Sequence, residues 1–130
     1  MSAPPVELSL TRLIDQARVD AYAEAARDPN PIHTDEAFAA SSPFGQRIAH
    51  GMLVLALVSE LMSEAFGERW ARTGGLKVRW RAPAIPPVTV AARASLRGVS
   101  EGVATYDVTC EAADGTVLLA GTASVTPGEP

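Results

Sequence analysis

The segment Gly51-Met-Leu-Val-Leu-Ala-Leu-Val-Ser-Glu-Leu-Met-Ser-Glu-Ala-Phe66 decides the fold of this chain, which has 130 residues. Residues 52–58 are apolar on every side of a helix, which predicts a long helix buried all round. Residues 76–81 (Leu-Lys-Val-Arg-Trp-Arg) then alternate apolar and basic side chains. This period of two predicts a strand whose apolar residues, including Trp80, face inward.

The flanking sequence predicts the remaining elements of the domain. A helix begins after the capping residue Asp15 and ends near Arg27, because Asp28 and Asn30 each precede a proline and are pushed away from the helical region. The other expected elements are a short helix over residues 36–40 and strands over 6–14, 88–97, 103–112 and 117–126. One buried helix and an antiparallel meander indicate a single α+β domain over residues 1–130, with the sheet wrapped around the helix and frayed tails at 1–5 and 127–130.

The charged residues are unevenly distributed along the chain. Hydrophobic residues make up 47% and charged residues 20%, which is enough apolar material for a core, and the net charge of -4 excludes a uniformly basic nucleic-acid-binding protein. Seven of the eleven basic residues nevertheless lie in one segment without an acidic residue, and we call them the basic stripe. They are Arg69, Arg72, Lys77, Arg79, Arg81, Arg93 and Arg97. Both an anionic ligand and a solvated sheet face would explain this stripe.

Several classes of protein are not expected from the sequence. The single cysteine, Cys110, excludes an internal disulfide and is expected to be a buried, inert thiol. The chain lacks both the run of about 20 apolar residues that a membrane span needs and the features of a signal peptide, so we expect a cytoplasmic protein without membrane contact. No cluster of Cys and His has metal-ligand spacing and no Gly-rich phosphate loop occurs, so we expect no metal and no cofactor.

Residues 26–33, Ala-Arg-Asp-Pro-Asn-Pro-Ile-His, contain the candidate catalytic groups. Two prolines restrict this loop, so that Asp28 and His33 keep little conformational freedom. A fixed carboxylate and a fixed imidazole suit proton transfer to and from water. The alternative is that Asp28 and Asn30 only form turns and that His33 opens the next helix.

The segment Ile48-Ala-His-Gly-Met-Leu53 leads directly into the long helix. The first backbone N–H groups of a helix have no partner within it and lie at the positive end of the helix dipole. The N–H at Gly51 could therefore hold a carbonyl oxygen on which negative charge develops. The alternative for Gly51 is tight packing at the helix start, and for His50 we expect a capping or packing role.

Residues 22–40 and 48–53 together closely resemble the hydratase motif of MaoC-like proteins. These are the (R)-specific enoyl-CoA hydratases and the related β-hydroxyacyl-thioester dehydratases, and the resemblance covers about residues 6–127. It implies the hot-dog fold, a catalytic water held by Asp28 and His33, and a thioester oxygen bound by the amide of Gly51. The family usually has Gly where this chain has Arg27.

The resemblance also implies a reaction and a substrate class. The reaction is the reversible hydration of trans-2-enoyl thioesters to (R)-3-hydroxyacyl thioesters, carried by CoA or by an acyl carrier protein. Candidate substrate-binding residues are Asn30 in the motif, Ser59 where many members carry a serine, Phe44 and Met52 as the lining of an acyl pocket, and Arg79 and Arg81 as cations for CoA phosphates. Core packing is the alternative for the two apolar residues.

Two other functions stay open from the sequence. One is a hot-dog thioesterase, which would release free thiol from an acyl-CoA, and the other is a non-catalytic partner subunit of a heteromeric dehydratase, against which the intact Asp28 and His33 argue. A lone domain of this kind leaves a sheet edge and an apolar face exposed, so we expect a homodimer or a higher homo-oligomer. The sequence does not predict the acyl chain length, the direction of reaction, or whether the pathway is that of fatty acids or polyketides.

Overall fold

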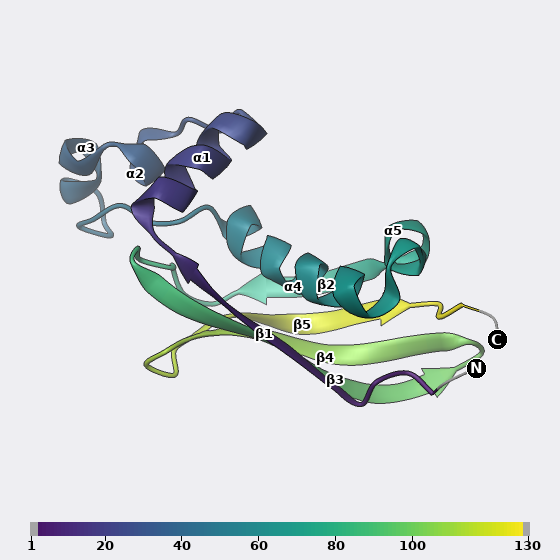
Figure 1. The fold of residues 1–130 in the computed structure, drawn as a ribbon. Helices are drawn as coiled ribbons and strands as arrows, with labels where there is room; N and C mark the ends of the chain where they lie inside the picture. The colour runs from purple at the N-terminus through teal and green to yellow at the C-terminus, as the bar shows by residue number, and fades with distance from the viewer. Residues whose placement is uncertain (1–2, 129–130) are drawn as a thin grey trace.

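Five antiparallel strands form one sheet within residues 3–128, which the computed structural model describes. The strands are β1 (Glu7–Ile14), β2 (Gly75–Trp80), β3 (Val88–Ser100), β4 (Val103–Ala112) and β5 (Val117–Val125), and their order across the sheet is β1-β3-β4-β5-β2. The helices are α1 (Gln16–Ala26), α2 (Pro31–Thr34), α3 (Glu36–Ala40), α4 (Gly51–Phe66) and α5 (Glu68–Thr73). Figure 1 shows the sheet curving around α4, with α1, α2 and α3 together over one end of the molecule. The predicted α+β architecture is confirmed.

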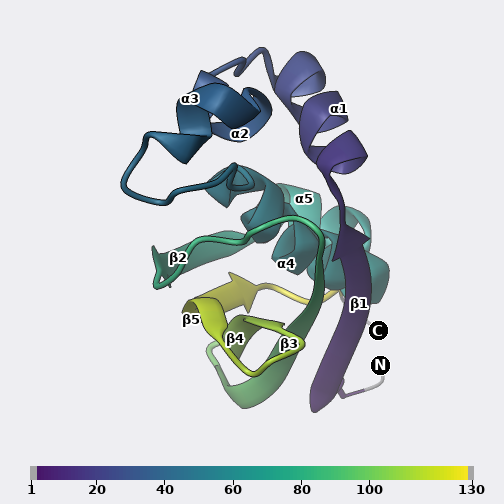
Figure 2. The same ribbon diagram turned by 90° about the vertical axis from the view of Figure 1, so that its left-hand side faces the viewer.

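The hydrophobic core lies between α4 and the concave face of the sheet (Figure 2). The buried residues of α4 are Leu53, Val54, Leu57, Val58, Leu61 and Met62. The facing positions of β3 include the fully buried Ala92 and Ala94, whose small side chains let the helix pack closely on the strands. The sheet covers only one side of α4, however: Met52 is 56% exposed and Ala56 is exposed as well. The prediction of a helix buried all round is therefore wrong.

The central strand β4 contributes Tyr106 and Cys110 to the core, and neither side chain is exposed. Burial raises the pKa of the Cys110 thiol to about 12, so the thiol stays protonated at neutral pH and is a poor nucleophile. This confirms the predicted inert cysteine. The Tyr106 hydroxyl donates to the carbonyl oxygen of Pro5 at 2.7 Å, so Pro5 is held although it falls in a predicted frayed tail. Residues 1–2 and 129–130, the ends of those tails, lie outside the described residues.

The helix boundaries follow the local capping chemistry. Oδ1 of Asp15 accepts from the backbone N–H of Arg18 at 2.8 Å and caps α1, as predicted, and Oδ1 of Asp35 accepts from Phe38 N at 3.0 Å and caps α3. The sequence pattern does not predict α2 or α5, which are both short. In α5, Trp70 is buried against α4 and its indole N–H donates to Ser59 Oγ at 3.0 Å, so tertiary packing holds this helix.

Trp80 lies on the side of the sheet that was predicted, but it is not buried in the core, because it is 50% exposed. It is the last residue of β2, and its indole lies over the first turn of α4, where Nε1–H donates to the carbonyl oxygen of Gly51 at 3.0 Å. The earlier apolar residues of this strand, Leu76 and Val78, pack against the core. Alternation along a strand therefore predicted the side of the sheet correctly, but the first turn of α4 covers only part of the Trp80 side chain at the end of the strand.

None of the helices in the described part of the chain is long and apolar enough to cross a membrane.

A left-handed residue ends α1 and fixes the start of the candidate loop. Arg27 has φ 56° and ψ 43°, and its side chain is exposed. The N–H of Asp28 donates to the carbonyl oxygen of Ala23 at 2.9 Å, and the N–H of Arg27 donates to that of Glu24 at 3.3 Å. Glycine is the preferred residue at a helix end of this kind, because a side chain in the left-handed conformation costs free energy. The backbone conformation therefore explains why a glycine at this position would be favoured.

Replacing Arg27 by glycine is expected to raise the free energy of unfolding by about 1 kcal/mol, since the left-handed conformation costs glycine nothing. Ala26→Gly is the matched control: it lies one residue earlier, in helical conformation, and should lower the free energy of unfolding by about 1 kcal/mol. Urea unfolding monitored by circular dichroism measures both. A loss of stability in Arg27→Gly would contradict this account of the loop.

Candidate active site

The loop between α1 and α2 is held by its own side chains. Asn30 precedes Pro31 at the start of α2, and its Oδ1 accepts from the N–H of Ile32 at 3.1 Å. Proline at the first helical position and asparagine at the cap are a favoured pair. The N–H of Asn30 in turn lies 3.4 Å from Oδ1 of Asp28. Asn30, a predicted substrate-binding residue, thus has its side-chain oxygen engaged in capping α2.

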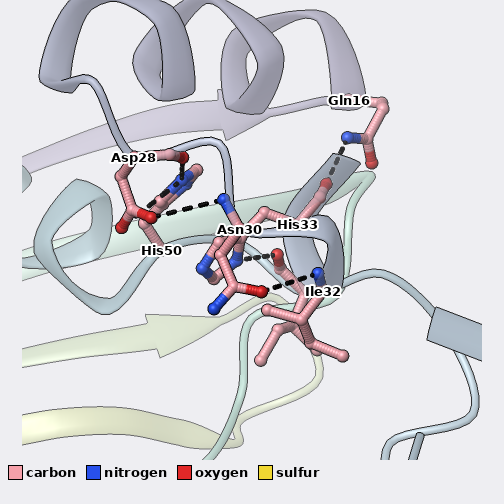
Figure 3. A network of polar contacts seen from close by, with 7 residues as sticks. Gln16, Asp28, Asn30, Ile32, His33 and His50 are labelled. Atoms are coloured by element: carbon pink, nitrogen blue, oxygen red, sulfur yellow. Dashed lines mark hydrogen bonds and ion pairs between the residues drawn. The ribbon is translucent and has the colours of Figure 1, made fainter. Parts of the chain in front are cut away.

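His33 lies on α2 and is fixed by two hydrogen bonds. Its ring Nδ1 lies 2.8 Å from the carbonyl oxygen of Ile48, and its own carbonyl oxygen accepts from Nε2 of Gln16 at 2.8 Å (Figure 3). Because a carbonyl oxygen can only accept, Nδ1 carries the proton. The neutral ring therefore keeps an unshared electron pair on Nε2, which is free to accept a proton or a hydrogen bond.

His50, which the sequence pattern placed only in a capping or packing role, joins this site. It is 2% exposed and makes no side-chain capping bond to α4. Its Nε2 lies 3.1 Å from the backbone oxygen of Asp28 and 4.0 Å from Oδ2 of the same residue. Its ring stacks on that of His33 with centroids 3.7 Å apart and planes 24° apart. No local pattern could predict this contact, because it depends on the approach of two segments 17 residues apart.

Asp28, His33 and His50 form the only cluster of potential metal ligands within residues 3–128, with one ligand atom of each within 4.8 Å of the others. The two imidazole rings are stacked, so their in-plane electron pairs run in nearly parallel planes and do not converge on one point. Nδ1 of His33 is also engaged by Ile48. The arrangement suits a bridging water better than a shared ion, and the absence of a resident metal stays a prediction.

The first turn of α4 presents unpaired backbone donors next to this loop. The first N–H groups to find an acceptor are those of Leu53 and Val54, which both donate to His50 O, at 3.0 and 3.3 Å. Those of Gly51 and Met52 find none among the described residues. A Cβ atom added to Gly51 would lie 2.8 Å from Nε1 of Trp80. Gly51 is therefore tightly packed against Trp80, as the predicted alternative had it. This packing does not occupy the backbone N–H of Gly51, which has no acceptor among the described residues.

A cavity of about 330 Å³ lies beside the start of α4. Its lining includes Phe44, Ile48, Gly51, Trp80, Arg81 and Leu118. Phe44 and Arg81 are predicted substrate-binding residues that the structure places here. Met52 does not line this cavity, and Ser59 lies further along α4 with its hydroxyl bonded to Trp70. The structure does not bring Ser59 together with Asp28 and His33.

The basic stripe is not one surface. Arg93 and Arg97 lie on β3 and pair with Glu111 and Asp107 of β4, and Arg72 pairs with Glu68. The exposed Lys77, Arg79 and Arg81 belong to β2 and the residue after it, and they have no ion-pair partner within residues 3–128. Together with Trp80 and Leu55 they line a groove of about 750 Å³. Among the ion pairs that the structure describes, this part of the stripe is the one left with unpaired positive charge next to the cavity.

Comparison with known proteins gives consistent matches. The family model of the MaoC like domain matches residues 3–115. The 3-hydroxyacyl-thioester dehydratase Z of Mycobacterium tuberculosis is 40% identical over 92 residues, which are 68% of this chain and 61% of that protein. The (R)-specific enoyl-CoA hydratase of Rhodospirillum rubrum is 29% identical over 119 residues, which are 90% of this chain and 82% of that protein. The chain thus spans about three fifths of the length of the first of these relatives.

Among solved structures, the (R)-hydratase of A. caviae, involved in PHA biosynthesis, has a TM-score of 0.83 with 27% identity over 94% of each chain. This match confirms the hot-dog fold that the sequence resemblance implied.

Proposed function

The chain belongs to the family of MaoC-like domains, and from that premise we propose that it catalyses the reversible hydration of trans-2-enoyl thioesters to (R)-3-hydroxyacyl thioesters. One observation carries the proposal. The carboxylate of Asp28 and the ring of His33 are held together beside a helix start whose Gly51 N–H has no acceptor among the described residues. Two proton-transfer groups and an oxyanion donor are the parts that this reaction needs. The names of the relatives, a hydratase and a dehydratase, support the same reaction.

The catalytic water would lie between Asp28 and His33. A carboxylate oxygen of Asp28 and a ring nitrogen of His33 lie within 4.8 Å of each other, a gap that one water can span with two bonds of about 2.8 Å. The carboxylate of Asp28 is an acceptor, and Nε2 of His33 is an acceptor as well because Nδ1 already donates to Ile48. The water would give one O–H to each and keep an electron pair on oxygen for attack on C3 of the enoyl thioester.

Asp28 and His33 together account for every proton that moves in the reaction. As the water oxygen bonds to C3, Asp28 takes a proton from it, and the electron pair of the C2=C3 double bond moves toward the thioester oxygen. The Gly51 N–H and the positive end of α4 stabilise the negative charge on that oxygen. The proton that Asp28 took up then passes to C2 with the help of Nε2 of His33, so one water is added and both side chains regain their starting states. Dehydration follows the same steps in reverse.

The acyl group and the carrier would bind on either side of the helix start. The cavity with Phe44 and Trp80 provides an apolar wall next to Gly51. The free cations Lys77, Arg79 and Arg81 lie along the adjoining groove and would contact the phosphates of CoA, which cationic side chains bind through charge-assisted hydrogen bonds. Met52 is exposed beside this site but is not part of the cavity wall.

A second copy of the chain would cover the outer edge of β2 and the exposed apolar side chains near it. β2 is an outer strand that pairs only with β5, so its other edge carries backbone groups without partners in the sheet. Three large apolar side chains near this edge are exposed, Phe44 at 46%, Met52 at 56% and Trp80 at 50%. A two-fold dimer is the simplest arrangement that covers such an edge and its apolar neighbours.

Asp28→Asn and His33→Ala are each expected to lower kcat on crotonyl-CoA by about 100- to 10,000-fold while KM changes little, because both side chains act on protons in the transition state. The loss of absorbance of the conjugated enoyl thioester measures turnover. Glu24→Gln, an exposed acid on α1, is the matched control and should keep wild-type kcat. Wild-type turnover by either site variant would refute the assignment, and thiol release without hydration would indicate a thioesterase.

The double variant Arg79→Gln/Arg81→Gln is expected to raise KM for crotonyl-CoA by roughly three- to tenfold and to flatten its rise with added salt, because phosphate contacts are screened by ions. Arg97→Gln on β3, whose arginine pairs with Asp107, is the control. The N-acetylcysteamine thioester lacks phosphates, so its KM should not respond to the double variant. If KM for crotonyl-CoA does not change, these arginines do not bind the carrier.

Sedimentation equilibrium is expected to give at least twice the mass of one chain, which is 13.6 kDa. The unpaired edge of β2 is the physical reason. A monomer at micromolar concentration would show that this edge is not used for self-association.

A further inference from the structure

His50 is the one buried polar or charged residue in the described part of the chain, and the reaction outlined above gives it no task. It contacts both groups that the reaction uses. Nε2 is 3.1 Å from the backbone oxygen of Asp28, and the ring face lies on that of His33. On its other side the ring of Tyr22 lies 4.8 Å away at a tilt of 58°. His50 is thus enclosed by α1, the catalytic loop and α2.

The other ring nitrogen of His50 argues against a purely packing role. Nδ1 is buried and has no hydrogen-bond partner within residues 3–128. A buried polar atom without a partner costs free energy, and an apolar ring of the same size would avoid that cost. The hydrogen bond of Nε2 is therefore what this position gains from histidine. Since the oxygen of Asp28 can only accept, Nε2 carries the proton.

Together, the contacts of His50 leave Asp28 and His33 little conformational freedom. The N–H of Asp28 is bonded to Ala23 and its carbonyl oxygen to His50, so its backbone is held on both sides. His33 is bonded through Nδ1 to Ile48, and the ring of His50 covers one of its faces. The stacked ring hinders tilting of the His33 ring toward His50, and the Nδ1 bond to Ile48 fixes which edge of the ring faces that residue. Nε2 of His33 is thereby kept on the side where the water would lie.

We propose that His50 is a positioning residue, which holds Asp28 through an Nε2–H bond and His33 through ring stacking so that both meet one water. The proposal rests on the hydratase function argued above. Displacement of a catalytic group by about 1 Å can cost about 100-fold in rate, so a positioning residue should affect kcat strongly. It should affect KM little, because it contacts no part of the substrate.

Two variants of His50 separate its hydrogen bond to Asp28 from its ring stacking on His33. His50→Phe keeps the flat ring and removes the donor, and it should lower kcat by about 10- to 100-fold with KM within threefold of wild type. Its Tm should not fall, because the unpartnered Nδ1 is removed as well. His50→Gln keeps an N–H donor and should lose less kcat than the phenylalanine variant. Wild-type kcat in His50→Phe, or a loss of kcat that only parallels a loss of Tm, would overturn the proposal.

Val58→Ala is the stability control for these variants. Val58 is fully buried on α4, so truncating it should lower Tm while kcat stays within twofold of wild type at a temperature well below the transition. This pattern is the reverse of the one expected for His50→Phe.

A spectroscopic readout keeps the proposal testable even if no enoyl thioester proves to be a substrate. The chain has two histidines, so their ring signals in a long-range ¹H–¹⁵N correlation spectrum are assigned by one variant. At a pH where both rings are neutral, His50 should carry its proton on Nε2 and His33 on Nδ1. A proton on Nδ1 of His50 would mean that Asp28 receives no bond from it, and the positioning role would fall whatever the activity.

Discussion

Two hydrogen bonds that run in opposite directions join the loop between α1 and α2 to the segment before α4, and the proposed site depends on them. His33 on α2 donates to the carbonyl oxygen of Ile48, and His50 donates to that of Asp28. The stacking of the two histidine rings lies between these bonds. Two segments that are separate in sequence thus become one unit. The same contacts place the loop over the first turn of α4, where the backbone N–H of Gly51 has no acceptor among the described residues.

The neighbouring helices α4 and α1 hold the two joined segments in place. α4 is anchored by its buried face on the sheet, so its first turn cannot shift without disturbing the core. On the other side, α1 ends in the left-handed residue Arg27, whose closure turns the chain sharply into the loop. Strain at such a residue persists only where surrounding contacts fix it. Here those contacts are the bonds that Asp28 makes to α1 and to His50.

Much of this could be predicted from sequence because it is local. The capping residue Asp15, the strand alternation, the Asp-x-Asn-Pro-x-His loop and the segment around Gly51 each show a pattern within a few residues. What could not be predicted depends on pairing across the fold. The antiparallel pairing of β3 with β4 neutralises Arg93 and Arg97. The end of β2 places Trp80 over Gly51, and the loop places His50 against His33.

In the proposed mechanism, Asp28, His33 and Gly51 all act on one bound enoyl thioester. A crystal structure of the Asp28→Asn variant with bound crotonyl-CoA would show whether they do. We expect the thioester oxygen within about 2.7–3.1 Å of the Gly51 nitrogen, with C3 facing the gap between the side chains at positions 28 and 33. A thioester bound elsewhere, or with its oxygen turned away from the start of α4, would contradict it.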